Sequence, residues 1–127
     1  MLGRCTKGTR GNAVIESYGF GKMVIDGKPY NKDVIILPGG SILHPWWRKS
    51  GHRVEMADID DLVKSEPDVL VIGTGNPGLM KPNPELRSAI KSLGIELVVT
   101  STKDAVKRYN DLMATGKKVG ACFHLTC

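Results

Sequence analysis

The sequence predicts an α/β domain in which parallel strands alternate with helices. The first observation is the apolar run over residues 69–72, which lies between Pro67 and the glycine-rich residues 73–78. An uninterrupted apolar run of this length is typical of a strand buried on both faces of a helix-covered sheet. The second observation is the order strand, helix, strand, helix, strand over residues 68–126, which is the signature of βαβ units. With 127 residues, the chain is long enough for one domain with its own core.

The first third of the chain is predicted to be rich in β-structure. Residues 1–12 carry three glycines and three positive charges but no acid, which indicates a flexible arm or an expression remnant. The domain is therefore expected to span residues 13–127. Strands are expected over residues 13–18, 22–25, 28–30 and 33–37. Asp26-Gly27 lies between the second and third of them and is a strong signal for a β-hairpin.

The second half has three helix-start signals. Asp58 is expected to cap the first helix, with acidic residues in its first turn. Asn83 followed by Pro84 is typical of an N-cap and first helical residue, and Ser101 opens a capping box. The resulting helices are predicted over residues 59–65, 84–93 and 102–115, with strands over residues 68–73, 95–99 and 117–126.

The connection over residues 38–52 fits neither the helix nor the strand period. It contains both tryptophans of the chain, Trp46 and Trp47. Large aromatic side chains normally belong to regular core elements. Two interpretations stay open: the indoles cover the core, or they line a binding surface.

Composition excludes several classes of protein. The net charge of +5 comes from basic residues scattered along the chain, and aromatic residues make up only 6%, so nucleic-acid binding is not expected. No apolar run approaches the roughly 20 residues of a membrane span, so we expect no membrane insertion. The N-terminus lacks the apolar core of a signal peptide, and the three cysteines fit free thiols, so a cytoplasmic protein is expected.

Gly73-Thr74-Gly75-Asn76-Pro77-Gly78 matches the spacing of a dinucleotide-binding loop. The next helix, however, begins several residues after the last glycine, and no acid ends the following strand. We therefore expect no nicotinamide cofactor, and no other cofactor is indicated. Backbone amides in this turn could hold an anion or a partner's carbonyl group, or the glycines could serve only a tight connection.

Cys122-x-His124-x-x-Cys127 has the residue types of a metal site. On a strand, Cys127 faces opposite to Cys122 and His124, and no fourth ligand is evident. We therefore predict no structural metal. The same geometry argues against a cysteine nucleophile with a histidine base. A buried thiol and a histidine at a strand end are expected instead.

Several motifs occur in an order that resembles a known family. They are Pro38-Gly39-Gly40-Ser41, Trp47-Arg48-x-x-Gly51, Val71-Ile72-Gly73-Thr74-Gly75, Thr102-x-x-Ala105-Val106-x-x-Tyr109-Asn110-x-Leu112, Gly116-x-x-Val119 and Phe123-His124-x-Thr126-Cys127. The chain resembles the small domain of unknown function shared by adipogenesis-associated proteins and mitochondrial complex I assembly factor 3. The resemblance implies three layers: a central mixed, mostly parallel sheet, flanking helices and an added N-terminal β-hairpin. It implies no enzymatic reaction.

We interpret the chain as a non-catalytic binding or assembly domain with a protein partner, for which a second copy of the chain is one candidate. No acid–base pair, nucleophile–base pair or complete metal-ligand set can be assembled from the sequence. We predict the binding surface as a crevice between the glycine turn (residues 73–78) and the tryptophan loop (residues 38–52), beside the start of the helix after Ser101. The alternative is an enzyme or small-anion binder that uses this crevice. The resemblance implies that Trp47, Gly73, Thr74, Gly75, Tyr109 and Asn110 surround this surface, although Tyr109 and Asn110 could equally be a core tyrosine and its surface neighbour. The full set of predicted site residues is Gly39, Gly40, Trp47, Arg48, Gly73, Thr74, Gly75, Asn76, Tyr109 and Asn110.

Overall fold

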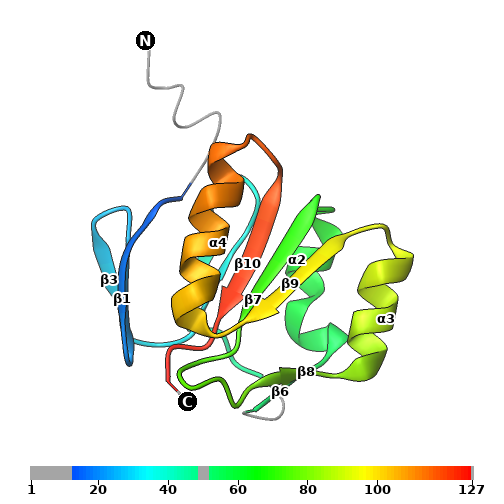
Figure 1. Ribbon diagram of the computed structural model, residues 1–127, viewed down its shortest axis with the longest axis horizontal. Helices are drawn as coiled ribbons and strands as arrows, with labels where there is room; N and C mark the ends of the chain where they lie inside the picture. The colour runs from blue at the N-terminus through cyan, green and yellow to red at the C-terminus, as the bar shows by residue number, and fades with distance from the viewer. Residues whose placement is uncertain (1–12, 49–51, 127) are drawn as a thin grey trace.

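The computed structural model describes residues 13–48 and 52–126 and is built around a mixed five-stranded sheet (Figure 1). In spatial order its strands are β5 (Ile42–Leu43), β4 (Val34–Ile36), β10 (Val119–Phe123), β7 (Val69–Gly73) and β9 (Glu96–Thr100). Strands β10, β7 and β9 are parallel, whereas β4 is antiparallel to β10 and β5 is antiparallel to β4. The prediction of a mixed α/β fold is confirmed.

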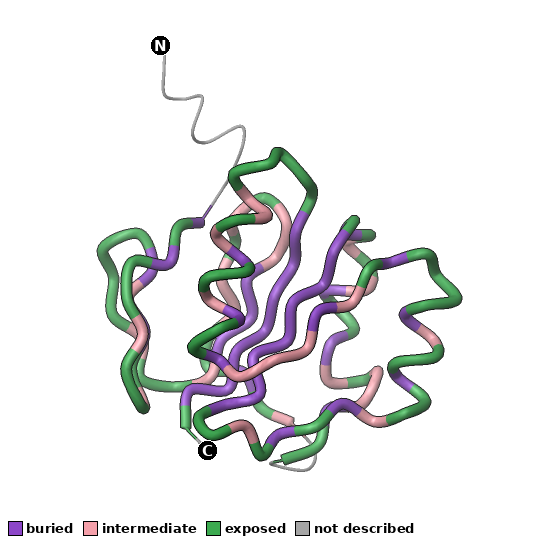
Figure 2. The backbone as a smooth tube through the Cα atoms, in the orientation of Figure 1, coloured by how far each residue is buried: buried purple, intermediate pink, exposed green. Residues whose placement is uncertain are grey.

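Strand β7 is a buried interior strand, as its apolar run predicts, although β10 and not β7 lies in the middle of the sheet. It pairs with β10 on one side and β9 on the other, and all five of its residues are buried (Figure 2). Val69 and Val71 point into the core on one face of the sheet, and Leu70 and Ile72 point into the core on the other. Both faces are apolar because helices or other strands cover both.

The face to which Val71 belongs is covered by α4 (Thr102–Ala114) and by a separate antiparallel sheet. That sheet contains β1 (Ile15–Gly19), β2 (Lys22–Ile25) and β3 (Lys28–Tyr30) and lies beside α4 in Figure 1. Asp26 and Gly27 form the turn between β2 and β3 with positive φ angles of 50° and 80°, as the Asp-Gly signal predicts.

The opposite face is covered by the remaining helices. They are the 3₁₀ helix η1 (Met56–Ile59), α2 (Asp60–Lys64) and α3 (Pro84–Ser92). Ile59, Leu62, Leu86 and Ile90 supply their buried side chains to this core. Two short strands, β6 (Arg53–Val54) and β8 (Lys81–Pro82), pair in parallel next to these helices. No helix within residues 13–48 and 52–126 is long and apolar enough to cross a membrane.

Two of the three predicted helix caps are confirmed. The side chain of Asn83 accepts a hydrogen bond from the Glu85 amide at 2.8 Å, and Ser101 accepts one from the Asp104 amide at 3.4 Å. Asp58 is not an N-cap. The N-cap is Glu55, and the Asp58 carboxylate accepts a hydrogen bond from the Glu55 amide at 2.9 Å. The helical segment therefore starts earlier, because Asp58 closes a capping box from inside the first turn.

The final strand ends at Phe123 and does not continue to Thr126 as predicted. The amide of His124 still donates to the Gly73 carbonyl at 2.9 Å, but the Leu125 amide donates to the Asp33 carboxylate at 2.8 Å. A side chain has thus replaced the neighbouring strand as hydrogen-bond acceptor. Cys122 is a buried free thiol, and the predictions for Cys5, Cys127 and residues 1–12 lie outside the described residues.

Candidate functional site

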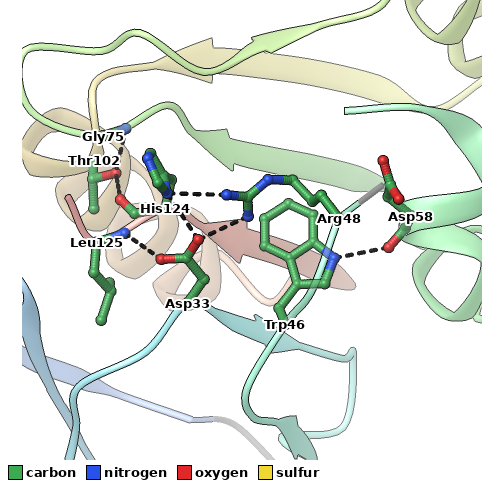
Figure 3. A network of polar contacts seen from close by, with 8 residues as sticks. All are labelled: Asp33, Trp46, Arg48, Asp58, Gly75, Thr102, His124 and Leu125. Carbon is green, nitrogen blue, oxygen red and sulfur yellow. Dashed lines mark hydrogen bonds and ion pairs between the residues drawn. The ribbon is translucent and has the colours of Figure 1, made fainter. Parts of the chain in front are cut away.

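An aspartate and a histidine meet at the edge of the sheet where β10 ends. Asp33 directly precedes β4 and His124 directly follows β10, and these strands are antiparallel, with Val34 opposite Phe123. The pairing brings Asp33 Oδ2 within 2.8 Å of His124 Nδ1 (Figure 3). The second carboxylate oxygen accepts the Leu125 amide at 2.8 Å. Both oxygens of Asp33 therefore bind the C-terminal segment.

Arg48 completes a network of three charged or polar side chains that are buried or largely buried. Its Nη1 donates to Asp33 Oδ2 at 2.8 Å, and its Nη2 lies 3.2 Å from His124 Nδ1. The guanidinium group also stacks on the Trp46 ring, 4.6 Å from its centroid. Only 6% of the Arg48 side chain and 14% of the Asp33 side chain are exposed, so solvent screens this ion pair weakly.

Asp33 selects the tautomer of the neutral His124 imidazole. Burial by itself raises the pKa of Asp33. Hydrogen bonds from His124, the Leu125 amide and Arg48 lower the pKa by more than burial raises it, so the net pKa lies below its ordinary value. The ionised carboxylate can only accept, so His124 Nδ1 carries a proton and donates it to Asp33. In the neutral ring, Nε2 then has the lone pair. His124 Nε2 is buried and has no hydrogen-bond partner.

The glycine turn is tied to the same segment. The Gly75 amide donates to Thr102 Oγ1 at 2.8 Å, and this hydroxyl donates to the His124 carbonyl at 2.6 Å. The Thr102 amide in turn donates to the Gly75 carbonyl at 3.0 Å. Thr102 thus joins three parts of the chain: the turn after β7, the first turn of α4 and the segment after β10.

Three successive amides of the glycine turn are not available to a ligand. The Thr74 amide donates to the Thr100 carbonyl at 2.9 Å, and the Asn76 amide donates to the Thr126 carbonyl at 3.0 Å. With the Gly75 amide bound to Thr102, three successive N–H groups have partners inside the protein. The prediction of free amides is wrong at these residues.

Close packing explains why the turn contains glycine. A Cβ atom on Gly73 would lie 2.8 Å from the Phe123 ring and 2.9 Å from Thr102 Oγ1. Gly75 has φ of 103°, a conformation that L side chains rarely adopt. The alternative that the glycines serve a tight connection therefore has direct geometric support.

The two tryptophans have opposite environments. Trp46 is 5% exposed, and its Nε1 donates to the Asp58 carbonyl at 2.8 Å, whereas Trp47 is 75% exposed. The indole of Trp46 belongs to the core under α2 and α3, and Arg48 is anchored to Asp33. An exposed indole is therefore held between two residues whose side chains are fixed.

Two predicted site residues lie at the other end of the sheet. Gly39 and Gly40 follow β4, which runs antiparallel to β10, so they lie beside the start of β10 rather than its end. A Cβ atom on Gly120 would be 3.3 Å from Pro38, which confirms this location. Gly39 lines a separate pocket of about 260 Å³ with Lys117 and Lys118. Gly39 and Gly40 therefore do not belong to a site at the Gly73 turn.

The side chains of Tyr109 and Asn110 hold the fold together and do not face the predicted crevice. Tyr109 is fully buried, and its ring packs edge-on against Phe123 with centroids 6.0 Å apart. The side chain of Asn110 bonds both backbone groups of Ile15, accepting from its N–H at 3.3 Å and donating to its C=O at 2.8 Å. Asn110 thus attaches α4 to β1. Neither residue lines the predicted crevice.

Sequence reasoning included Arg48 but missed Asp33 and His124 as a pair. The sequence by itself indicates a strand-end histidine at His124 and a strand residue at Asp33. The pair depends on contact between residues 91 positions apart in the sequence. The available signal was weak: a lone acid before one strand and a lone histidine after another. An acid–histidine pair does exist, which corrects the expectation that none can be assembled.

The profile of the family described as "Protein of unknown function (DUF498/DUF598)" matches residues 15–124. The chain belongs to this family. Every residue of the buried network, Asp33, Arg48 and His124, falls within the matched region of the DUF498/DUF598 domain.

Solved structures share the fold of this DUF498/DUF598 domain. A protein called MT938 is 27% identical with a TM-score of 0.77, over 91% of this chain and 100% of that chain. The conserved hypothetical protein PH1505 from Pyrococcus horikoshii OT3 is 28% identical with a TM-score of 0.75, over 89% and 98% of the two chains. A protein from Bartonella henselae, described as an outer membrane protein, is 27% identical with a TM-score of 0.78, over 94% and 99%.

Proposed function

We propose that this DUF498/DUF598 domain is a non-catalytic binding domain that contacts a protein partner through Trp47, with the glycine turn over residues 73–78 as a second part of the binding surface. The observation that carries the proposal is the exposure of Trp47, 75%, between the buried Trp46 and the anchored Arg48. A role in the assembly of a larger complex fits a domain of this kind and agrees with the family resemblance.

The energetic argument rests on how Trp47 is held. An exposed indole costs free energy in water, and its burial in a partner's pocket recovers that free energy. Tryptophan and arginine are enriched among the residues that dominate binding energies at interfaces. The contacts of Trp46 and Arg48 restrict the backbone on both sides of Trp47, so little conformational entropy is lost when the indole is bound.

An enzyme is the second candidate, favoured by one observation. Asp33 orients His124 through Nδ1 and leaves Nε2 without a partner, as in sites where a carboxylate positions a histidine base. The small-anion alternative has less support, because the amides of Thr74, Gly75 and Asn76 are already bound. We therefore favour partner binding.

Photo-crosslinking tests the proposal. A photoreactive phenylalanine analogue is placed at position 47, and in a second protein at position 20, where Phe20 is 62% exposed in the β1–β2 connection. In cells of the source organism, we expect a discrete crosslinked species from position 47 and none of the same mass from position 20. The Trp47→Ala protein should lose at least tenfold in affinity for the captured partner, while Phe20→Ala retains it.

Equal crosslinking from both positions would contradict the assignment of Trp47. A second copy of the chain is one of the partners that this experiment can identify. Sedimentation velocity of the purified chain, with and without Trp47→Ala, then shows whether self-association depends on the same indole.

A further inference from the structure

A second histidine lies against His124. The ring centroids of His52 and His124 are 5.6 Å apart, and their planes cross at 76°. The backbone of His52 is fixed, because its carbonyl accepts the Lys81 amide at 2.9 Å, while the residue itself is exposed. The His52 imidazole can therefore change rotamer without moving the backbone.

His124 has the features of a metal ligand. Histidines that bind metals almost always donate the other ring N–H to a carboxylate or carbonyl group, which sets the tautomer and raises the basicity of the ligating nitrogen. Asp33 does this for His124 at 2.8 Å. The result is a lone pair on Nε2 that is buried and has no partner. Figure 3 shows Nδ1 turned toward Asp33 and Arg48, so the opposite edge of the ring is directed away from the ion pair.

We propose that His52 and His124 Nε2 together hold a divalent transition-metal ion of the copper–zinc class. With metal–nitrogen bonds of about 2.0–2.1 Å, two imidazoles on one ion have centroids roughly 5–6 Å apart, which is the separation already present. Only a turn of the His52 ring is needed to direct one of its nitrogens at the ion. Imidazole ligands favour copper, zinc and nickel over magnesium and calcium.

The local charge permits this occupancy. Arg48 lies on the Nδ1 edge of the ring and is neutralised by Asp33, so the ion approaches a net-neutral network from the opposite edge. Among residues 13–48 and 52–126, no group of three or more histidine, cysteine or acidic residues is placed to hold a metal. Water or an external ligand would fill the remaining positions. Such a site differs from a closed structural zinc site, in which the protein supplies all four ligands.

Calorimetric titration with Cu²⁺ and with Zn²⁺ tests this inference. Thiols are good ligands for both ions, so the parent protein for the test carries Cys5→Ser and Cys127→Ser. We expect one saturable equivalent in the parent. His52→Ala should weaken binding at least tenfold, because it removes one of two protein ligands. His44→Ala is the matched control, since the His44 ring packs against Tyr30 instead, and it should bind as the parent does.

Electron paramagnetic resonance of the Cu²⁺ protein adds a readout independent of stability. The parent should show hyperfine coupling to two imidazole nitrogens, and His52→Ala should show one. His124→Gln perturbs the buried network and can unfold the domain, so the exposed His52 variant decides the result. No saturable binding in the parent, or equal binding by the His52→Ala and His44→Ala proteins, would overturn the inference.

Discussion

At the scale of single residues, two buried polar atoms among the described residues have no hydrogen-bond partner: Tyr109 Oη and His124 Nε2. Their surroundings differ. Tyr109 lies among Val71, Ala105, Phe123 and other apolar core residues, whereas His124 lies in a polar network. We therefore assign a ligand-binding role to the second atom only.

Replacing Tyr109 by Phe removes a buried hydroxyl that makes no hydrogen bond. Burial of such a group costs about 1–3 kcal/mol. Tyr109→Phe should therefore leave the free energy of unfolding unchanged or raise it by up to about 2 kcal/mol, measured by urea denaturation. Tyr18→Phe is the contrasting variant, because Tyr18 Oη donates to the Leu125 carbonyl at 2.9 Å. The free energy of unfolding of Tyr18→Phe should fall by about 1 kcal/mol. Equal losses in Tyr18→Phe and Tyr109→Phe would contradict the conclusion that the Tyr109 hydroxyl makes no hydrogen bond.

At the scale of elements, the buried strand β7 and the start of α4 position the site. Val71 is fully buried between the paired strands β10 and β9. Val71→Ala should lower the free energy of unfolding by about 1–3 kcal/mol, because it leaves a cavity under α4. Val14→Ala is the control, since Val14 is 52% exposed. The free energies of unfolding of the two variants are measured by thermal and urea denaturation. Equal values for Val71→Ala and Val14→Ala would refute the burial of Val71.

Thr102 is the link between α4, the glycine turn and the C-terminal segment. Thr102→Val keeps the shape of the side chain but leaves the Gly75 amide and the His124 carbonyl without their hydrogen bonds. Each buried group left unpaired costs about 1–3 kcal/mol. We expect a clear loss of stability and faster hydrogen exchange at the Gly75 amide. Thr115→Val, on the exposed C-terminal turn of α4, should change neither by a comparable amount.

At the scale of the whole molecule, Asp33 joins three distant segments: the start of β4, the tryptophan loop and the end of the chain. Its pKa is lower in the folded protein than in the unfolded chain. The corresponding stability is therefore fully present above the unfolded value, about pH 4, and is lost as the pH falls through the folded pKa.

Urea denaturation from pH 6 to pH 2.5 measures this contribution. Stability of the native chain should decline toward the acid limit, and Asp33→Asn, although less stable at pH 6, should decline less steeply. Asp111→Asn, on the exposed side of α4, is the control and should follow the native slope. Identical slopes for the Asp33→Asn and native proteins would contradict the role of the ionised Asp33 carboxylate.

The sequence alone determined the features that depend on neighbouring residues. The apolar run over residues 69–72 predicted a strand buried on both faces, Asn83 and Ser101 predicted two helix starts, and Asp26-Gly27 predicted a turn. Each of these signals acts over a few residues, through side-chain burial, capping or backbone conformation. For this reason each can be identified without knowing the rest of the fold.

Only the tertiary structure decided which polar groups meet. Asp33 and His124 come together because β4 is antiparallel to β10, and no local pattern specifies that pairing. The same long-range packing buries Trp46 while leaving Trp47 exposed, and it places Gly39 at the opposite end of the sheet from Gly73. The turn amides likewise found acceptors in Thr100, Thr102 and Thr126, far from them in sequence. Hydrogen-bond satisfaction in a buried site is a property of the folded chain, because the partners come from segments that only the packed sheet brings together.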